Sequence, residues 1–147
     1  MATNRIALIT SARVQEHIAG AAFSPGHLLE YASDGDVQKH STEGDYALRL
    51  IALEDALQGN IISTAYAAAD RAQVLHAVPG DKVQMMLNAG ENVAIGDVLI
   101  SDGAGALIAE GSASSGVTVK QAIAIAREAL DLSASGAVDT LIDVEII

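Results

Sequence analysis

Short apolar runs alternate with turn-forming residues through the middle of the chain, between residues 78 and 110. Clusters such as Pro79-Gly80-Asp81 and Gly96-Asp97 separate the runs. Gly supplies positive φ, Pro fixes φ, and Asp or Asn side chains hydrogen-bond to their own backbone, so each cluster predicts a chain reversal. The pattern is typical of a β-meander, with strands expected at residues 83–87, 93–95, 98–100 and 106–109.

The clearest hairpin signal is Ser101-Asp102-Gly103-Ala104-Gly105, which lies between two aliphatic runs. Strands this short are only marginally stable in isolated hairpins, so they must close into a barrel or pack face to face. We therefore predict a mainly β fold, a small β-barrel or sandwich, with at most one or two short helices.

Further elements follow from periodicity on either side of the meander. Alternation predicts strands at residues 45–53, 61–66 and 72–77, and a closing strand at 139–147. One helical turn is expected at residues 54–58, ended by Gly59. Residues 121–130 fit two structures: the Ala and Leu content favours a helix, whereas small residues alternating with Ile favour a strand.

The first 45 residues differ from the rest of the chain. They contain the only Phe and three of the four His, and Gly20, Pro25-Gly26 and residues 33–36 interrupt any long element. We predict an extended arm, residues 1–45, with short strands at 5–10, 27–31 and 37–40, followed by a barrel-like body, residues 46–147. Such an arm buries too little apolar surface to order itself, so its natural partner is another chain.

Composition argues against several partners. The chain has 147 residues and a net charge of −11, with 19 acidic and 8 basic residues, so a phosphate backbone would be repelled and no nucleic-acid partner is expected. Aromatic residues, which stack bases and sugars, are scarce. No apolar run is long enough to span a bilayer, and no membrane partner is expected. The absence of Cys excludes disulfides and thiolate metal sites.

Candidate chemistry is equally sparse. The acidic residues Asp34, Asp36, Glu43 and Asp45 lack the spacing of an EF-hand loop, and we interpret them as solvated turn residues. The four His never occur at the i, i+4 spacing of a helical metal pair. The Ser residues of loop 111–116 lack a nucleophile elbow. We predict no catalytic residue, no metal, no cofactor and no enzymatic activity.

The last two thirds of the chain, from about residue 60, resemble the decoration or cement proteins of tailed-bacteriophage heads. The resemblance rests on the following motifs: Val78-Pro79-Gly80-Asp81-Lys82-Val83, residues 89–99, Ser101-Asp102-Gly103-Ala104-Gly105, and residues 124–130 before a terminal strand. It implies a structural protein of the virion that is made in the host cytoplasm, binds the outer capsid surface and stabilises contacts between major capsid subunits. It also implies a homo-oligomer, most simply a trimer.

Within this interpretation the arm is expected to lie along the capsid, with Arg5, Arg13, Phe23 and Tyr31 as contact residues. The alternative is a swivelling carrier of the biotinyl or lipoyl kind, or another small β-barrel binding module, because residues 90–99 look like the turn of those half-barrels. Carriers hold a modifiable Lys at a hairpin tip. The Lys residues here, Lys39, Lys82 and Lys120, lie outside the predicted hairpin.

Overall fold

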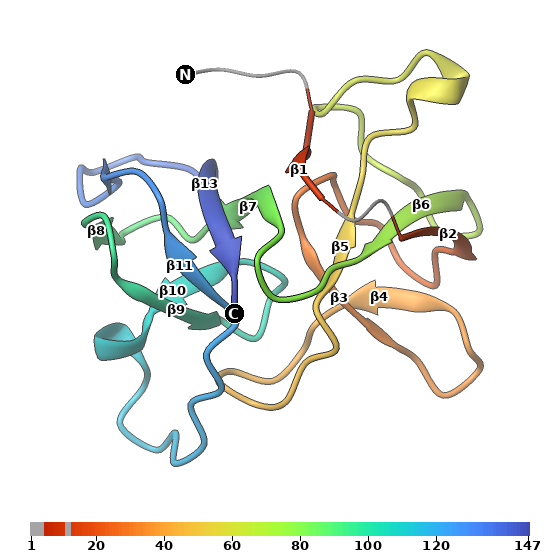
Figure 1. Cartoon of the computed structure of the whole chain (residues 1–147). Helices are drawn as coiled ribbons and strands as arrows, with labels where there is room; N and C mark the ends of the chain where they lie inside the picture. Colours follow the sequence, from red (N-terminus) through yellow and green to blue (C-terminus); the bar gives the residue numbers. More distant parts are fainter. Residues whose placement is uncertain (1–4, 11–12) are drawn as a thin grey trace.

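The computed structural model describes residues 5–10 and 13–147, which form two β units side by side (Figure 1). No α-helix is present in this described part, only two short 3-10 turns, η1 (Ala56–Gln58) and η2 (Glu110–Ser112). The strands are β1 (Ala7–Ile9), β2 (Val14–Ile18), β3 (Leu28–Tyr31), β4 (Val37–Lys39), β5 (Leu50–Ala52), β6 (Arg71–His76), β7 (Lys82–Leu87), β8 (Asn92–Val93), β9 (Val98–Ser101), β10 (Leu107–Ala109), β11 (Ala124–Ala126), β12 (Leu130–Asp131) and β13 (Thr140–Ile146). The predicted mainly β fold is confirmed.

The first unit is a closed five-stranded barrel. Its strand order is β7-β10-β9-β11-β13, and β13 returns to pair with β7 in antiparallel register from Thr140↔Leu87 to Glu145↔Lys82. The predicted closing strand therefore does close the barrel. Closure leaves neither edge of β13 open, which removes the aggregation hazard of a long exposed strand.

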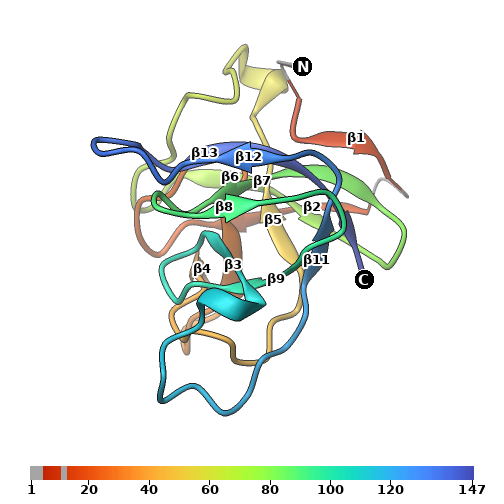
Figure 2. The ribbon, with the colours of Figure 1, turned by 90° about the vertical axis from the view of Figure 1, so that its left-hand side faces the viewer.

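Two small additions flank the barrel. Strand β1 pairs with the start of β7 through Ala7↔Val83, and β8 pairs with β12 through Leu130↔Val93. Figure 2, which faces the barrel, shows β8 and β12 running together across the front. Val93 and Leu132 belong to the barrel core, so this ribbon covers one end of the barrel.

The second unit is a five-stranded sheet in the order β2-β6-β5-β3-β4. Its two edge strands approach each other where Ala19 bridges Val37, so the sheet curls. One face carries Leu29, Leu50 and Val74, which pack with Phe23 and Tyr66 in a core of their own. The opposite side of the sheet packs against the barrel.

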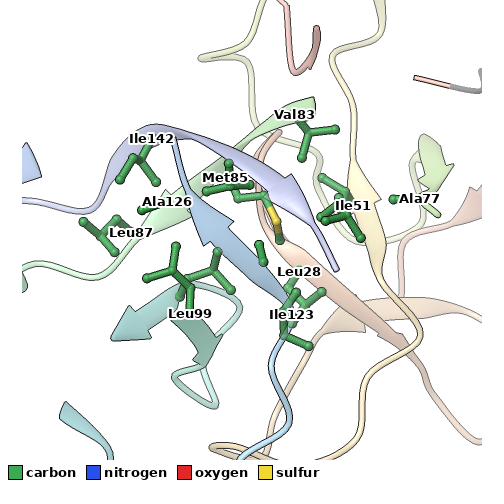
Figure 3. Packing of buried hydrophobic residues seen from close by; sticks show 14 of the residues in the cluster. Leu28, Ile51, Ala77, Val83, Met85, Leu87, Leu99, Ile123, Ala126 and Ile142 are labelled. Atoms are coloured by element: carbon green, nitrogen blue, oxygen red, sulfur yellow. The ribbon is translucent and has the colours of Figure 1, made fainter. Parts of the chain in front are cut away.

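The barrel and the sheet share one hydrophobic core. Leu28, Ile51 and Leu75 lie opposite one another on β3, β5 and β6, and all three are fully buried with barrel residues such as Met85. Figure 3 shows Leu28 and Ile51 directed toward Met85 and Ile123 of the barrel. A sheet buried on both faces needs continuous apolar runs rather than alternation, which is why Leu28-Leu29 and Leu50-Ile51 occur as pairs.

Main-chain hydrogen bonds also join the two units. The N–H of Leu28 donates to the carbonyl of Gly105 at 2.8 Å, and the N–H of Met86 donates to Gly26 at 3.0 Å. Gly44 has a φ of 71°, and a Cβ there would lie 2.4 Å from the carbonyl oxygen of Val119. Only glycine permits this approach at a positive φ. The loop after β4 is therefore fixed against the barrel.

For residues 5–10 and 13–45, these contacts correct the prediction of an arm that cannot order itself; residues 1–4 and 11–12 of that predicted arm lie outside the described residues. The strands expected at 27–31 and 37–40 exist as β3 and β4, but β3 pairs with β5, and β2 pairs with β6 along its whole length. Strands on both sides of the predicted boundary at residue 45 thus share one sheet. Burial of Leu28 and Leu29 inside this chain supplies the apolar contacts that the arm hypothesis assigned to a partner.

Other expectations meet mixed outcomes. Residues 121–130 contain no helix; strand β11 and the first residue of β12 lie within them. The turn η1 ends at Gly59 as expected, and Gly59 takes the left-handed conformation. The strand predicted at 45–53 is confined to β5, because Arg49 has a φ of 54° that interrupts the extended backbone. The prediction of a strand at residues 61–66 is wrong. Only Tyr66 finds a bridge partner there, while the Thr64 hydroxyl accepts from the N–H of Ile61 in a turn.

Candidate functional surface

The four predicted contact residues divide into one buried and three exposed side chains. Phe23 is only 2% exposed, and its ring centroid lies 5.4 Å from that of Tyr66 in the second core. Its side chain is thus unavailable to a capsid, and the prediction for this residue is wrong. Tyr31 is 43% exposed, and Arg5 and Arg13 are exposed before β1 and β2.

Tyr31 and Arg13 lie beside the same edge strand. The ring of Tyr31 contacts that of His17 edge-on, with centroids 5.5 Å apart, and His17 lies 5.4 Å from the ring of His76. The N–H of His76 donates to the carbonyl of Arg13 at 2.8 Å. We call Arg13, His17, Tyr31 and His76 the β2 surface. Strand β2 lies at the outer edge of the second sheet (Figure 1).

Strand β2 is unusual because most of its side chains are exposed on both faces. Val14 is 44% exposed and Ile18 is 38% exposed, and Glu16 forms a solvent-exposed ion pair with Arg71 at 2.7 Å. An edge strand with exposed apolar side chains is a template for pairing with another chain. The β2 edge is therefore a candidate interaction site.

The two histidines of this surface are hydrogen-bonded to each other. Their Nε2 atoms lie 3.1 Å apart, and both side chains are half-buried. Burial lowers the pKa of His76 from its ordinary value, and the neighbouring His17 lowers it further. His76 is therefore held toward the neutral form. Sequence spacing could not reveal this pair, because 59 residues separate its members and they meet only through their side chains on a shared face of β2 and β6.

A second candidate surface lies on the outside of the barrel. Ile95, Ile125 and Ile147 line a shallow groove of about 450 Å³ together with the exposed ion pair between Arg127 and Glu145. Next to it, across Arg127, a smaller groove of about 210 Å³ is lined by Leu8, Ile9, Lys82, Asp143 and Val144. Ile95 is 71% exposed and Ile9 63%, so this outer face combines large apolar side chains with paired charges.

The remaining polar clusters are used internally. His40 and Ser101 resemble a base beside a nucleophile, with Nδ1 and Oγ 2.7 Å apart, but they are only 2% and 0% exposed. The Nε2 of His40 lies 3.0 Å from the carbonyl of Tyr46, and the Ser101 hydroxyl also accepts from the N–H of Gly103. A substrate cannot reach this pair. It fastens the loop after β4 to the barrel.

The acidic residues weighed as a cation site do not converge. Asp34 accepts from the N–H of Asp36, Glu43 accepts from Ser114, and Asp45 accepts from the N–H of Tyr46. Within residues 5–10 and 13–147, no group of three or more His, Asp or Glu could hold a metal ion. In the same part of the chain, no helix is both long and apolar enough to cross a membrane.

A polar cleft of about 510 Å³ lies between η1 and the start of β6. Its carboxylates cap the local backbone: Asp55 accepts from the N–H of Gln58, and Asp70 accepts from the N–H of Ala67. The Tyr66 hydroxyl donates to the carbonyl of Leu53 at 2.6 Å, and burial raises the pKa of this phenol to about 12. These groups stabilise a long loop and are not arranged for acid–base chemistry.

The lysines considered for a carrier function are dispersed. The side chain of Lys39 packs against Gly105, Lys82 begins β7, and the Nζ of Lys120 donates to the carbonyl of Glu110. The segment at residues 90–99 that suggested a carrier includes β8, the turn that follows it and the start of β9, and it contains no Lys.

Comparison with known proteins gives a likeness to solved structures. No family model matches the chain, and no curated protein matches it. Among solved structures it is similar to the N base of the head fiber protein gp8.5 in bacteriophage phi29, with a TM-score of 0.55. The two are 14% identical, and the match covers 91% of this chain and 92% of the other. At that identity the likeness shows a shared fold.

Proposed function

We propose that this protein is a structural component of a tailed-phage head, which binds the outer surface of the capsid and stabilises contacts between major capsid subunits. The observation that carries this proposal is the likeness to the phi29 head-fiber base, which extends over nearly the whole of both chains. The sequence motifs that resemble capsid decoration proteins support the same interpretation independently of that likeness.

The physical character of the chain suits a role without catalysis. The polar groups described above serve caps, ion pairs and the joint between the two units, and the charge of −11 favours docking against a positively charged surface. The closed barrel and the curled sheet share one hydrophobic core, and this gives a rigid body that can bridge two neighbouring capsid subunits. A structural protein on a capsid needs these properties and no reactive group.

We assign the capsid contact to the β2 surface and the adjacent edge of β2. Arg13 and Tyr31 belong to the residue types that most often dominate binding energy at interfaces. The edge of β2 can also accept a strand from a neighbour through main-chain hydrogen bonds. Arg5, exposed before β1, is proposed as a further contact in place of the arm-mediated binding predicted from the sequence.

A homo-oligomer, most simply a trimer, completes the proposal. The two larger sheets have edges at β1, β2 and β4, whereas β13 is closed on both sides. Light scattering tests this directly. A trimer of the 15.0 kDa chain has a mass of about 45 kDa, three times that value. A mass of one chain at micromolar concentration would show that the protein does not assemble before it meets the capsid.

The binding test compares matched surface variants on phage heads that lack the protein. The double variant Arg13→Ala/Tyr31→Ala removes one cation and one large exposed side chain from the β2 surface. Interface residues of these types contribute about 1–2 kcal/mol or more each, so binding should weaken by at least about tenfold. The control Leu57→Ala/Lys120→Ala removes a similar pair elsewhere, since Leu57 is 89% exposed on η1.

The control should bind heads like the unmodified protein. If the double variant also binds unchanged, the β2 surface is not the contact. If the unmodified protein binds no phage head, the capsid role itself is contradicted. Deleting the first 20 residues would not be informative, because β2 would be lost from the sheet together with any contact residues.

A further inference from the structure

We infer that His17 and His76 form a binding site for a divalent transition-metal ion, with zinc as the expected ion. The two residues are 59 positions apart in sequence. The antiparallel register of β2 and β6 sets His17 opposite Ala72, which places both histidines on one face of the sheet, and their side chains meet along that face. The site lies within the β2 surface, and its metal binding can be measured on the isolated protein without any phage head.

The distance between the two Nε2 atoms fits two ligands of one metal ion. With metal–nitrogen bonds of about 2.0–2.1 Å, two nitrogens lie about 2.9 Å apart at a right angle and about 3.3 Å apart at the tetrahedral angle. The observed separation of 3.1 Å falls between these values. Small rotations of the two rings would direct both lone pairs at one ion without movement of either strand.

The protonation state of the pair also suits a metal. In a neutral His–His hydrogen bond one Nε2 carries the proton and the other accepts it. Metal binding requires both Nε2 atoms to be free of protons. The ring that donates in the hydrogen bond therefore carries its proton on Nδ1 once the metal is bound, and the protein releases no net proton. The pKa of His76 is lowered by burial and by His17, which keeps this ring available near neutral pH.

The surroundings hold the rings while leaving the site accessible. The edge of Tyr31 packs against the His17 ring, and the main-chain N–H of His76 is bound to Arg13. Both imidazoles are only half-buried, so solvent reaches the pair and water can complete the coordination. Imidazole nitrogens favour Zn²⁺, Ni²⁺ and Cu²⁺ over Mg²⁺ or Ca²⁺. The net negative charge of the chain adds a general attraction for cations.

The test is calorimetric titration of the full chain, free of any histidine tag, with Zn²⁺, Ni²⁺, Cu²⁺ and Mg²⁺. The first three should bind with one ion per chain, and Mg²⁺ should not bind. His17→Gln and His76→Gln should each weaken binding by at least about tenfold, since losing an outer-sphere partner alone costs about 10–100-fold. The control Gln15→Ala, on the same strand, should bind normally.

Histidine NMR spectra of the unmodified protein supply a readout that does not depend on any variant. Zn²⁺ should shift the ring signals of His17 and His76 and leave those of His27 and His40 in place. No binding of the three ions at millimolar concentration would overturn the inference. So would binding that persists in His17→Gln, or ion-induced shifts confined to the other two histidines.

Discussion

The hydrogen bond between His40 and Ser101 offers a sharp test of how the two β units are joined. His40 follows β4 in the second sheet, and Ser101 ends β9 in the barrel. Both side chains are buried, and their atoms Nδ1 and Oγ lie 2.7 Å apart. If this contact fixes the loop after β4 to the barrel, removing either side chain should destabilise the whole protein rather than loosen one loop.

The expected loss of stability follows from the polar groups that each substitution leaves without a partner. Ser101→Ala removes a hydroxyl that is hydrogen-bonded to Nδ1 of His40 and accepts from the N–H of Gly103 at 3.1 Å. A buried polar group left without a partner costs about 1–3 kcal/mol, so the free energy of unfolding should fall by about 2–4 kcal/mol. His40→Ala should cost a similar amount, because it leaves the Ser101 hydroxyl and the Tyr46 carbonyl unpaired and opens a cavity.

The assay is urea unfolding at pH 7.5 of the unmodified protein, the two single variants and the double variant. Because each single variant already breaks the contact, the double variant should lose less than the sum, with a coupling energy of about 1–2 kcal/mol. Ser63→Ala, at an exposed position, should change stability by less than about 0.5 kcal/mol. Additive losses within about 0.5 kcal/mol would refute the coupling between the two units.

Two further predictions concern stability. Gly26→Ala should cost more than Gly35→Ala in urea unfolding, although their φ angles are 91° and 92°, because a Cβ at Gly26 would lie 2.4 Å from the Cδ2 of Leu141 while Gly35 faces open space; equal losses would contradict the close packing of the two units. Burial and nearby Lys39 lower the pKa of His27 below its ordinary value of 6.5, and burial with nearby His17 lowers that of His76. The unfolded chain therefore binds more protons than the folded one just below pH 6.5, so stability should be fully present above that pH and fall below it. Urea midpoints from pH 8 to 5.5 measure this, and a flat profile would contradict it.

Turn chemistry explains why the strands of the barrel could be predicted. Each Gly-Asp or Pro-Gly turn imposes a local backbone conformation, so β7, β9 and β10 follow from neighbouring residues alone. The strand predicted at 93–95 keeps only Val93, because the N–H of Ala94 donates to the side chain of Asp97 in the next turn. The predicted turn at Gly59 was correct for the same reason, since glycine readily takes the left-handed conformation that ends η1. Local signals of this kind do not depend on the rest of the fold.

The role of residues 1–45 could not be predicted in this way. Their Gly and Pro residues indicated a broken chain, yet Gly26 and Gly44 allow close approach to the barrel. Leu28 and Leu29 look unremarkable as a pair of apolar residues, and only the pairing of β3 with β5 shows that they serve two different cores. Such pairings join residues distant in sequence and leave no local pattern.

The candidate surface likewise has residues that the sequence could identify and residues that it could not. Exposed Arg13 and Tyr31 could be singled out from their residue types, whereas Phe23, selected by the same reasoning, packs on Tyr66 from a loop 43 residues further along. The His17–His76 pair depends on strand register and had no signal in the spacing of the four histidines. Single-residue chemistry identified candidates, and tertiary pairing decided which of them share a site.

We propose that the protein lies on the outside of a phage head. Antibodies against the purified chain, applied to intact gradient-purified virions of a tailed phage whose genome carries its coding sequence and followed by gold labelling in the electron microscope, measure this most directly. We expect gold on the surface of the heads, and none on virions that lack the protein. Virions whose heads remain unlabelled, while disrupted particles show no trace of the chain by mass spectrometry, would contradict it.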